Sequence, residues 1–180
     1  MSKNVLVIST SLRKSGNSDK LADAFVEGAL SAGHHAEKLN LQGKDIAFCR
    51  GCLACQKTHQ CVIADDAIGI AEKMRTADVI AFATPIYYYE MSGQMKTLLD
   101  RANSLYGSDY AFREIYLLSA AAEDEPGVDS RAISGLEGWI ACFEKAHLAG
   151  TVFCGGVNQV GDIQGHVALE EAHSMGASIG

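Results

Sequence analysis

Hydroxyl, amide and cationic side chains gather in one short stretch of the chain, residues 9–18. The stretch reads Ser-Thr-Ser-Leu-Arg-Lys-Ser-Gly-Asn-Ser and leads into an apolar pattern typical of a helix. The first N–H groups of a helix are free and the positive end of its dipole lies there, so such a place binds phosphate. The residue types predict an anion site, although Asn17 or Ser18 would also serve as an ordinary helix cap.

Motifs that are absent narrow the kind of phosphate. Neither the G-x-G-x-x-G fingerprint of dinucleotide-binding folds nor the G-x-x-x-x-G-K-[ST] loop of nucleoside triphosphatases follows the first apolar run. No cysteine has an arginine six residues later, as a phosphatase on a similar sheet would need, and no acidic cluster ends that run, as a response regulator would need. A cradle for one terminal phosphate remains, and FMN would suit it.

Three consecutive tyrosines, residues 87–89, form a second suggestive segment. They follow an apolar run and Pro85, which we expect to end a strand. Aromatic rings at the end of a strand suit a flat ligand. The alternative is that they pack as amphipathic loop residues at a subunit contact.

Four of the six cysteines, Cys49, Cys52, Cys55 and Cys61, have the spacing C-x2-C-x2-C-x5-C. Cysteines at x2 intervals are typical of bacterial iron–sulfur runs, although Val62 replaces the usual proline. Zinc is disfavoured because structural zinc sites usually join two separate ligand pairs. Three roles for these cysteines stay open: ligands of a cluster, a redox-active dithiol, or structural thiols. We favour thiols without a metal. Because the segment follows a strand, we expect it at the same sheet edge as the other two segments.

Composition and charge exclude several classes of protein. The 180 residues carry 15 Lys+Arg against 22 Asp+Glu, a formal net charge of −7, which argues against nucleic acid or an anionic membrane as a partner. The N-terminal apolar run is too short for a signal peptide, and no window resembles a membrane span. We therefore expect one domain over residues 1–180 and a cytoplasmic protein with reduced thiols.

The elements that position these segments alternate between short apolar runs and longer amphipathic patterns, which is typical of a doubly wound α/β domain with a parallel sheet. The expected strands span residues 3–9, 34–41, 78–84, 114–121 and 149–155. The expected helices span residues 17–32, 64–76, 92–105, 128–146 and 162–177. Several topologies fit, and the strand order 2-1-3-4-5 is a common one, with its ligand between the first and third strands.

Three segments together resemble the NAD(P)H-dependent FMN reductases of the flavodoxin-like superfamily, in the branch that includes the iron–sulfur flavoproteins. The segments are residues 11–18, residues 49–66 and residues 84–101, and they occur in the family's order. Leu12 departs from the proline that related sequences usually have. The resemblance implies a flavodoxin-like three-layer sandwich with a five-stranded parallel sheet of order 2-1-3-4-5.

The resemblance also implies a set of FMN-binding residues. Those expected to hold the phosphate are Ser11, Arg13, Asn17 and Ser18. Those expected at the flavin ring are Pro85, Ile86, Tyr87 and Tyr88, with Gly93 and Lys96 just beyond and with Ser119, Ala120 and Ala121 from the loop after the fourth strand. FMN carries the hydride itself, so we assign neither a catalytic acid or base nor a metal ligand.

The expected function is transfer of hydride from NADH or NADPH through FMN to a quinone, a flavin or another small acceptor. The alternative is an iron–sulfur flavoprotein that carries single electrons, with a 4Fe-4S cluster on the four cysteines. The resemblance also implies a homodimer or homotetramer, with the flavin near the subunit interface.

Overall fold

Five parallel strands make the central sheet of this computed structural model, which describes all 180 residues. The strands are β1 (Asn4–Ser9), β2 (His35–Asn40), β3 (Val79–Tyr87), β5 (Glu114–Ala120) and β6 (His147–Cys154). Their order is β2-β1-β3-β5-β6, and a short strand, β4 (Glu90–Met91), pairs antiparallel with the end of β3. With β4 set aside, this order confirms the flavodoxin-like topology that the sequence predicted.

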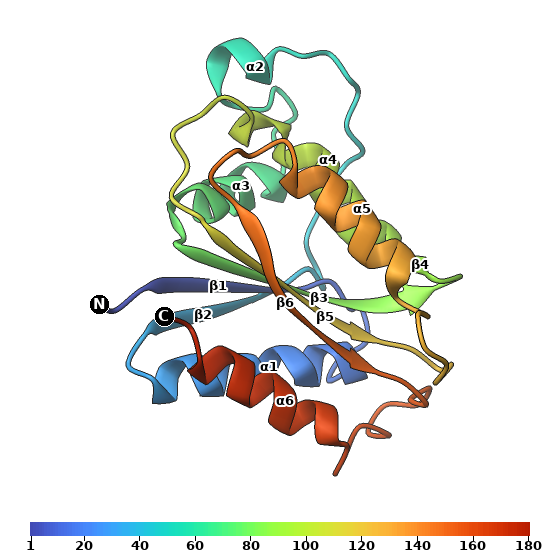
Figure 1. Cartoon of the computed structure of the whole chain (residues 1–180). Helices are drawn as coiled ribbons and strands as arrows, with labels where there is room; N and C mark the ends of the chain where they lie inside the picture. The colour runs from blue at the N-terminus through green and yellow to red at the C-terminus, as the bar shows by residue number, and fades with distance from the viewer.

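Helices cover both faces of the sheet (Figure 1). Helices α1 (Asn17–Ser31) and α6 (Val167–Ala177) lie on one face, and α3 (Asp66–Thr76), α4 (Gly93–Arg101) and α5 (Ser130–Ile140) lie on the other. A short helix, α2 (Cys55–Thr58), projects beyond α4, and a 3-10 turn, η1 (Ala102–Leu105), follows α4. No helix has the length and apolar character needed to cross a membrane.

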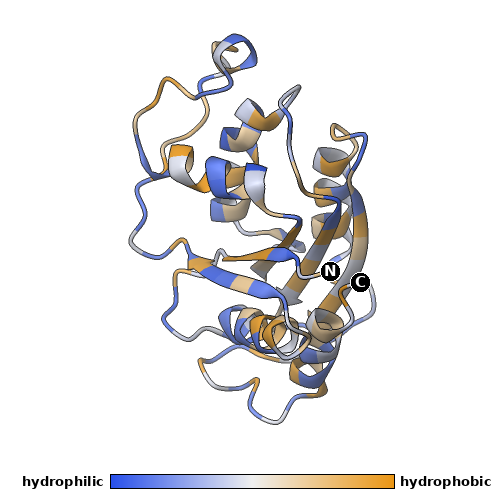
Figure 2. Ribbon diagram, turned by 90° about the vertical axis from the view of Figure 1, so that its left-hand side faces the viewer, coloured by the Kyte–Doolittle hydropathy of each residue, from blue (hydrophilic) through white to orange (hydrophobic).

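Alternation along the strands builds two cores. In β1, Val5 and Val7 pack with α1 and α6, whereas Leu6 and Ile8 pack on the opposite side with α3 and α4. Successive side chains of a strand point to opposite faces, so a run of apolar residues serves both cores. Figure 2 shows this hydrophobic colour along the central strands, between the two helical layers.

The expected end of the third strand at Pro85 was wrong, because β3 continues to Tyr87. The pairing of β1 with β3 stops at Ala83, so Pro85 is flanked by β5 alone. A proline is tolerated where one side of a strand needs no N–H donor. Because of this extension, Tyr87 belongs to β3, and β4 pairs with the last residues of β3.

Three expected helices were too long. The fourth is limited to Ser130–Ile140, the last begins at Val167, and the third ends at Arg101 before η1. Before the last helix, Gly161 and Gly165 have φ values of +97° and +75°, and the Asp162 carboxylate accepts from the Asn158 and Gln159 N–H groups. This separate turn prevents an earlier helix start.

Candidate functional site

A phosphate cradle lies where β1 ends and α1 begins, and we define it as Ser11, Arg13, Gly16, Asn17 and Ser18. These five residues line one cavity of about 140 Å³ at the carboxyl ends of the strands. Gly16 is the N-cap residue of α1 and offers no side chain to the free N–H groups of the first turn. The helix therefore begins with donors available for an anion.

Two observations in the cradle fit a bound phosphate. The Ser18 hydroxyl is buried and has no hydrogen-bond partner in the chain, which is costly unless a ligand supplies one. A Cβ at Gly16 would lie 2.7 Å from Ser11 Oγ and 3.2 Å from the Arg13 carbonyl oxygen. A side chain at this position would displace the Ser11 hydroxyl and crowd the Arg13 carbonyl, so glycine leaves both groups in place beside the cavity.

Arg13 and Asn17 are held from the opposite side by the loop after β6. Arg13 Nη1 donates to the Asn158 carbonyl at 2.8 Å, and Asn17 Nδ2 donates to the Gln159 carbonyl at 3.0 Å. Val157 and Asn158 line the same cavity. The loop after the last strand is thus a third wall of the site, which the local sequence pattern did not reveal.

An apolar chamber of about 320 Å³ adjoins the cradle cavity. Its lining residues are Ile86, Tyr87, Tyr88, Tyr89, Ala121, Ala122, Glu123 and Val128. Ile86, Tyr87, Ala121 and Ala122 line both cavities, so the two form one groove. The groove joins a polar end that suits a phosphate to an apolar, aromatic end that suits a flat ring.

Three buried hydroxyls tie the walls of the groove together. Ser92 Oγ lies 3.0 Å from Thr10 Oγ1 and accepts from Thr84 Oγ1 at 3.2 Å, while the Ser92 N–H donates to Thr84. All three residues are fully buried. The loop after β1, the end of β3 and the start of α4 are therefore fixed to one another.

The structure brings most of the expected FMN-binding residues to this groove. The cradle cavity is lined by Ser11, Arg13, Asn17, Ser18, Pro85, Ile86, Tyr87, Ala120 and Ala121, and the chamber adds Tyr88. Gly93, Lys96 and Ser119 lie outside the lining: Lys96 pairs with Asp100 on the exposed face of α4, and Ser119 Oγ donates to Asp129 in the interior. A role for these three in binding FMN stays a prediction.

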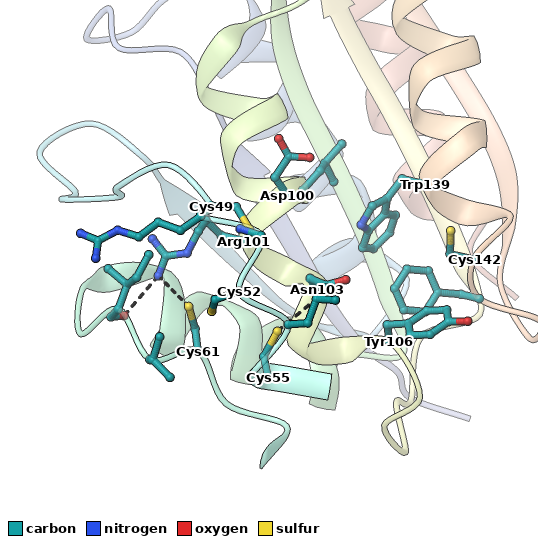
Figure 3. Close-up of a pocket in the computed structure, with 17 residues that line it drawn as sticks. Cys49, Cys52, Cys55, Cys61, Asp100, Arg101, Asn103, Tyr106, Trp139 and Cys142 are labelled. Atoms are coloured by element: carbon teal, nitrogen blue, oxygen red, sulfur yellow. Dashed lines mark hydrogen bonds between the residues drawn. The ribbon is translucent and has the colours of Figure 1, made fainter. Parts of the chain in front are cut away.

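The four cysteines line a second cavity, of about 440 Å³, which shares no residue with the groove. Figure 3 shows them facing Tyr106, Trp139 and Cys142 across it. This cavity lies at the C-terminal ends of α4 and α5. The expectation that the thiols share the edge of the first groove was wrong, because the segment after β2 climbs over the helical layer before α2 begins.

N–H groups donate to three of the four sulfur atoms. The Gly51 N–H lies 3.4 Å from Cys49 Sγ, Asn103 Nδ2 lies 3.2 Å from Cys55 Sγ, and Arg101 Nη2 lies 3.4 Å from Cys61 Sγ. The thiols nevertheless do not form a ligand set, because no three Cys, His, Asp or Glu side chains come together in a group that could hold a metal ion.

A buried ion pair fixes both ends of the cysteine segment. Arg101 and Asp65 are almost fully buried, and the guanidinium donates to both carboxylate oxygens at 2.5 and 2.8 Å. Arg101 also donates to the carbonyls of Ala47 and Ile63, which flank the segment. The hydrogen bonds from Arg101 hold the pKa of Asp65 below its usual value despite burial.

Comparisons with known proteins identify the family of this chain. The model of the NADPH-dependent FMN reductase family matches residues 3–129. An iron–sulfur flavoprotein of Methanosarcina thermophila is 30% identical over 93% of this chain and 85% of its own length. The NAD(P)H-dependent FMN-containing oxidoreductase YwqN of Bacillus subtilis is 30% identical over 95% of both chains.

Solved structures show the same fold. An NAD(P)H:quinone oxidoreductase from Methanothermobacter marburgensis superposes with a TM-score of 0.74 at 17% identity, covering 99% of both chains. An azoreductase from Bacillus anthracis has a TM-score of 0.72 at 18% identity, covering 99% of this chain and 100% of its own. At such low identity these likenesses speak for the fold alone.

Proposed function

Because this chain belongs to the NADPH-dependent FMN reductase family, we propose that it oxidises NADH or NADPH through bound FMN and reduces a quinone. Membership of the family makes the chain an FMN-dependent oxidoreductase. The quinone as electron acceptor is our proposal. The supporting observation is the single groove, in which an unpartnered buried hydroxyl and free helix N–H groups lie at one end and an aromatic chamber lies at the other.

The residues of the groove have separable tasks. The cradle would bind the FMN phosphate through Ser11, Ser18 and the first N–H groups of α1, with Arg13 supplying positive charge. Pro85, Ile86 and Ala121 would hold the flavin ring against apolar surface and keep water from one side of it. FMN supplies the chemistry, accepting hydride from the nicotinamide and passing two electrons onward, so no side chain need act as acid or base.

The first experiment is the visible spectrum of the purified protein, followed by turnover. We expect flavin bands and a steady oxidation of NADH or NADPH that requires a soluble benzoquinone. NADH and NADPH are tested separately, and the ratio of their kcat/KM values gives the nucleotide preference. A colourless protein that fails to bind added FMN would contradict the proposal, and so would a flavoprotein that neither nucleotide reduces.

A second candidate function is one-electron transfer through an iron–sulfur cluster on the four cysteines. It is supported by the shared cavity and by the three N–H donors to sulfur. Against it, the sulfur atoms do not come together in a group that could hold a metal ion. Iron and acid-labile sulfide analysis of protein purified anaerobically tests it: about four irons per chain would favour the carrier.

We further propose a cytoplasmic homodimer or homotetramer. The support is the family resemblance, which implies an assembly with the flavin near the subunit interface. Light scattering coupled to gel filtration gives the mass directly, and a monomer at micromolar concentration would contradict the proposal.

A further inference from the structure

The tip of the β3–β4 hairpin holds two residues in an unfavourable backbone conformation. Ile86 pairs with Met91 and Tyr87 pairs with Glu90, which leaves Tyr88 and Tyr89 as a two-residue loop. Their φ values are +51° and +65°. Loops in which both residues have positive φ usually contain Asn-Gly, because a larger side chain is crowded there. Two tyrosines are therefore less favourable for this turn than Asn-Gly would be.

The tyrosine rings contribute little to stability in return. Tyr88 is 96% exposed and Tyr89 is 49% exposed. Neither ring belongs to a hydrophobic core, and neither hydroxyl makes a hydrogen bond. Backbone strain that brings no gain in packing is characteristic of positions that act on a ligand.

The chamber beneath these rings indicates what that ligand is. Both tyrosines line the apolar chamber, and Glu123 is its only charged residue. An aromatic wall favours a flat ring, and a lone carboxylate disfavours an anion. The chamber opens from the cradle cavity through their shared walls, Ile86 and Tyr87. A neutral, planar molecule that enters it would lie next to whatever occupies the cavity.

We propose that Tyr88 and Tyr89 form an aromatic platform that binds the quinone acceptor and determines acceptor specificity. The proposal rests on the function proposed above and adds to it the residues that select the acceptor. In the overall reaction NAD(P)H gives up a hydride and becomes NAD(P)⁺, while the quinone takes up that hydride equivalent and one proton from solvent and becomes the hydroquinone. The tyrosines bind and orient the acceptor and are not catalytic.

The test is the double variant Tyr88→Asn/Tyr89→Gly, which supplies the residues that the turn prefers. We expect the KM for a neutral benzoquinone to rise about fivefold to tenfold through loss of the aromatic contacts. Turnover with ferricyanide should stay within a factor of two, because a small anionic one-electron acceptor does not need the platform. Tyr88 is thus assigned to the acceptor and not to the flavin ring, where the family resemblance placed it, because Tyr88 and Tyr89 line the chamber and not the cradle cavity. The Kd for FMN, measured by flavin fluorescence, should therefore be unchanged.

Two further variants sharpen the result. Tyr88→Phe/Tyr89→Phe keeps the rings and should restore the quinone KM, whereas Tyr106→Asn, an exposed tyrosine at the cysteine cavity, should leave it unchanged. An unchanged quinone KM in the Asn-Gly variant would overturn the proposal. It would also fall if the variant lost FMN affinity, which would make the tyrosines part of the flavin site, or changed its mass on gel filtration, which would make them a subunit contact. Failure of the wild-type protein to bind FMN would instead remove the function proposed above.

Discussion

Ser18 shows at the residue scale how a helix start can be shaped for a ligand rather than for stability. An ordinary serine in the first turn of a helix accepts or donates within the chain, but the Ser18 hydroxyl is buried without a partner. Gly16 likewise forgoes the capping side chain that Ser, Asn or Asp would provide. The cradle is thus less stable on its own than an ordinary loop, and a bound phosphate would supply what it lacks.

We therefore predict opposite effects of Ser18→Ala on stability and on binding. Without FMN, the free energy of unfolding should stay unchanged or rise by up to about 1 kcal/mol, because an unsatisfied hydroxyl is removed. The Kd for FMN should rise about tenfold. Urea denaturation and fluorescence titration measure the two quantities. Ser174→Ala, in the exposed part of α6, serves as the control, and an equal FMN affinity in wild type and Ser18→Ala would contradict the assignment.

At the scale of elements, α1 and α6 approach so closely that their backbones touch. A Cβ at Gly28 would lie 2.0 Å from the His173 carbonyl oxygen, and one at Gly176 would lie 2.2 Å from the Phe25 carbonyl oxygen. Neither neighbour can move without shifting a helix. The amphipathic pattern predicted both helices, but no local pattern reveals that each of these glycines faces the backbone of the other helix.

Gly28→Ala should destabilise the protein by about 1–3 kcal/mol, since the added methyl group must push the helices apart. The matched control is Gly69→Ala in α3, where a Cβ would meet nothing within 4 Å. There the change should stabilise by about 0.5–1 kcal/mol, because alanine favours a helix interior. Thermal unfolding of both variants gives the comparison, and a melting temperature for Gly28→Ala equal to that of the wild type would refute the close packing.

The Arg101–Asp65 pair makes stability depend on pH. The lowered pKa of Asp65 means that its contribution is fully present above the ordinary value of 3.8 and is lost as the pH falls through the folded value. Asp65→Asn should cost about 3 kcal/mol at neutral pH, because Arg101 stays buried and unpaired.

Denaturation of wild type and Asp65→Asn at several pH values tests this dependence. The difference between the two proteins should narrow as the pH falls below 3.8. Asp100→Asn, which breaks an exposed pair with Lys96, should cost less than about 1 kcal/mol at any pH. A constant difference between wild type and Asp65→Asn across this range would contradict the linkage.

The same elements show what sequence alone can supply. Local residue types predicted the strands and the anion site at the start of the first helix. The strand pattern alone left several sheet orders open, and the family resemblance implied the observed order and most residues of the groove. Asn158 could not be found in this way, since its contribution is a backbone carbonyl brought from 145 residues away. The predicted place of the cysteines was also wrong. A long connection without a helical or strand pattern does not show along which side of the sheet the chain runs.

At the scale of the whole molecule, the groove and the cysteine cavity are independent sites on one chain. They share no lining residue, and the helices α4 and α5 extend between them. A simple reductase needs only the first, whereas an electron carrier would need both. We therefore expect that a change in the cysteine cavity does not alter FMN binding in the groove.

Replacing all four cysteines of the segment by serine should leave the Kd for FMN within a factor of two of the wild-type value. Turnover of NAD(P)H with a quinone should also persist. Flavin titration and steady-state rates provide the measurements, with the single variant Cys142→Ser as a control for the cavity wall. Loss of FMN from the serine variant would show that the two sites depend on each other.

The contact between α1 and α6 has a practical consequence. The N-terminal end of α1 carries part of the cradle, and its C-terminal half packs closely against α6, the last helix of the chain. Heat or a protease that separates α6 from α1 should therefore also release FMN. Flavin fluorescence is quenched less in free solution than against aromatic side chains. An increase in flavin fluorescence would then report that α6, at the C-terminal end of the chain, has separated from α1.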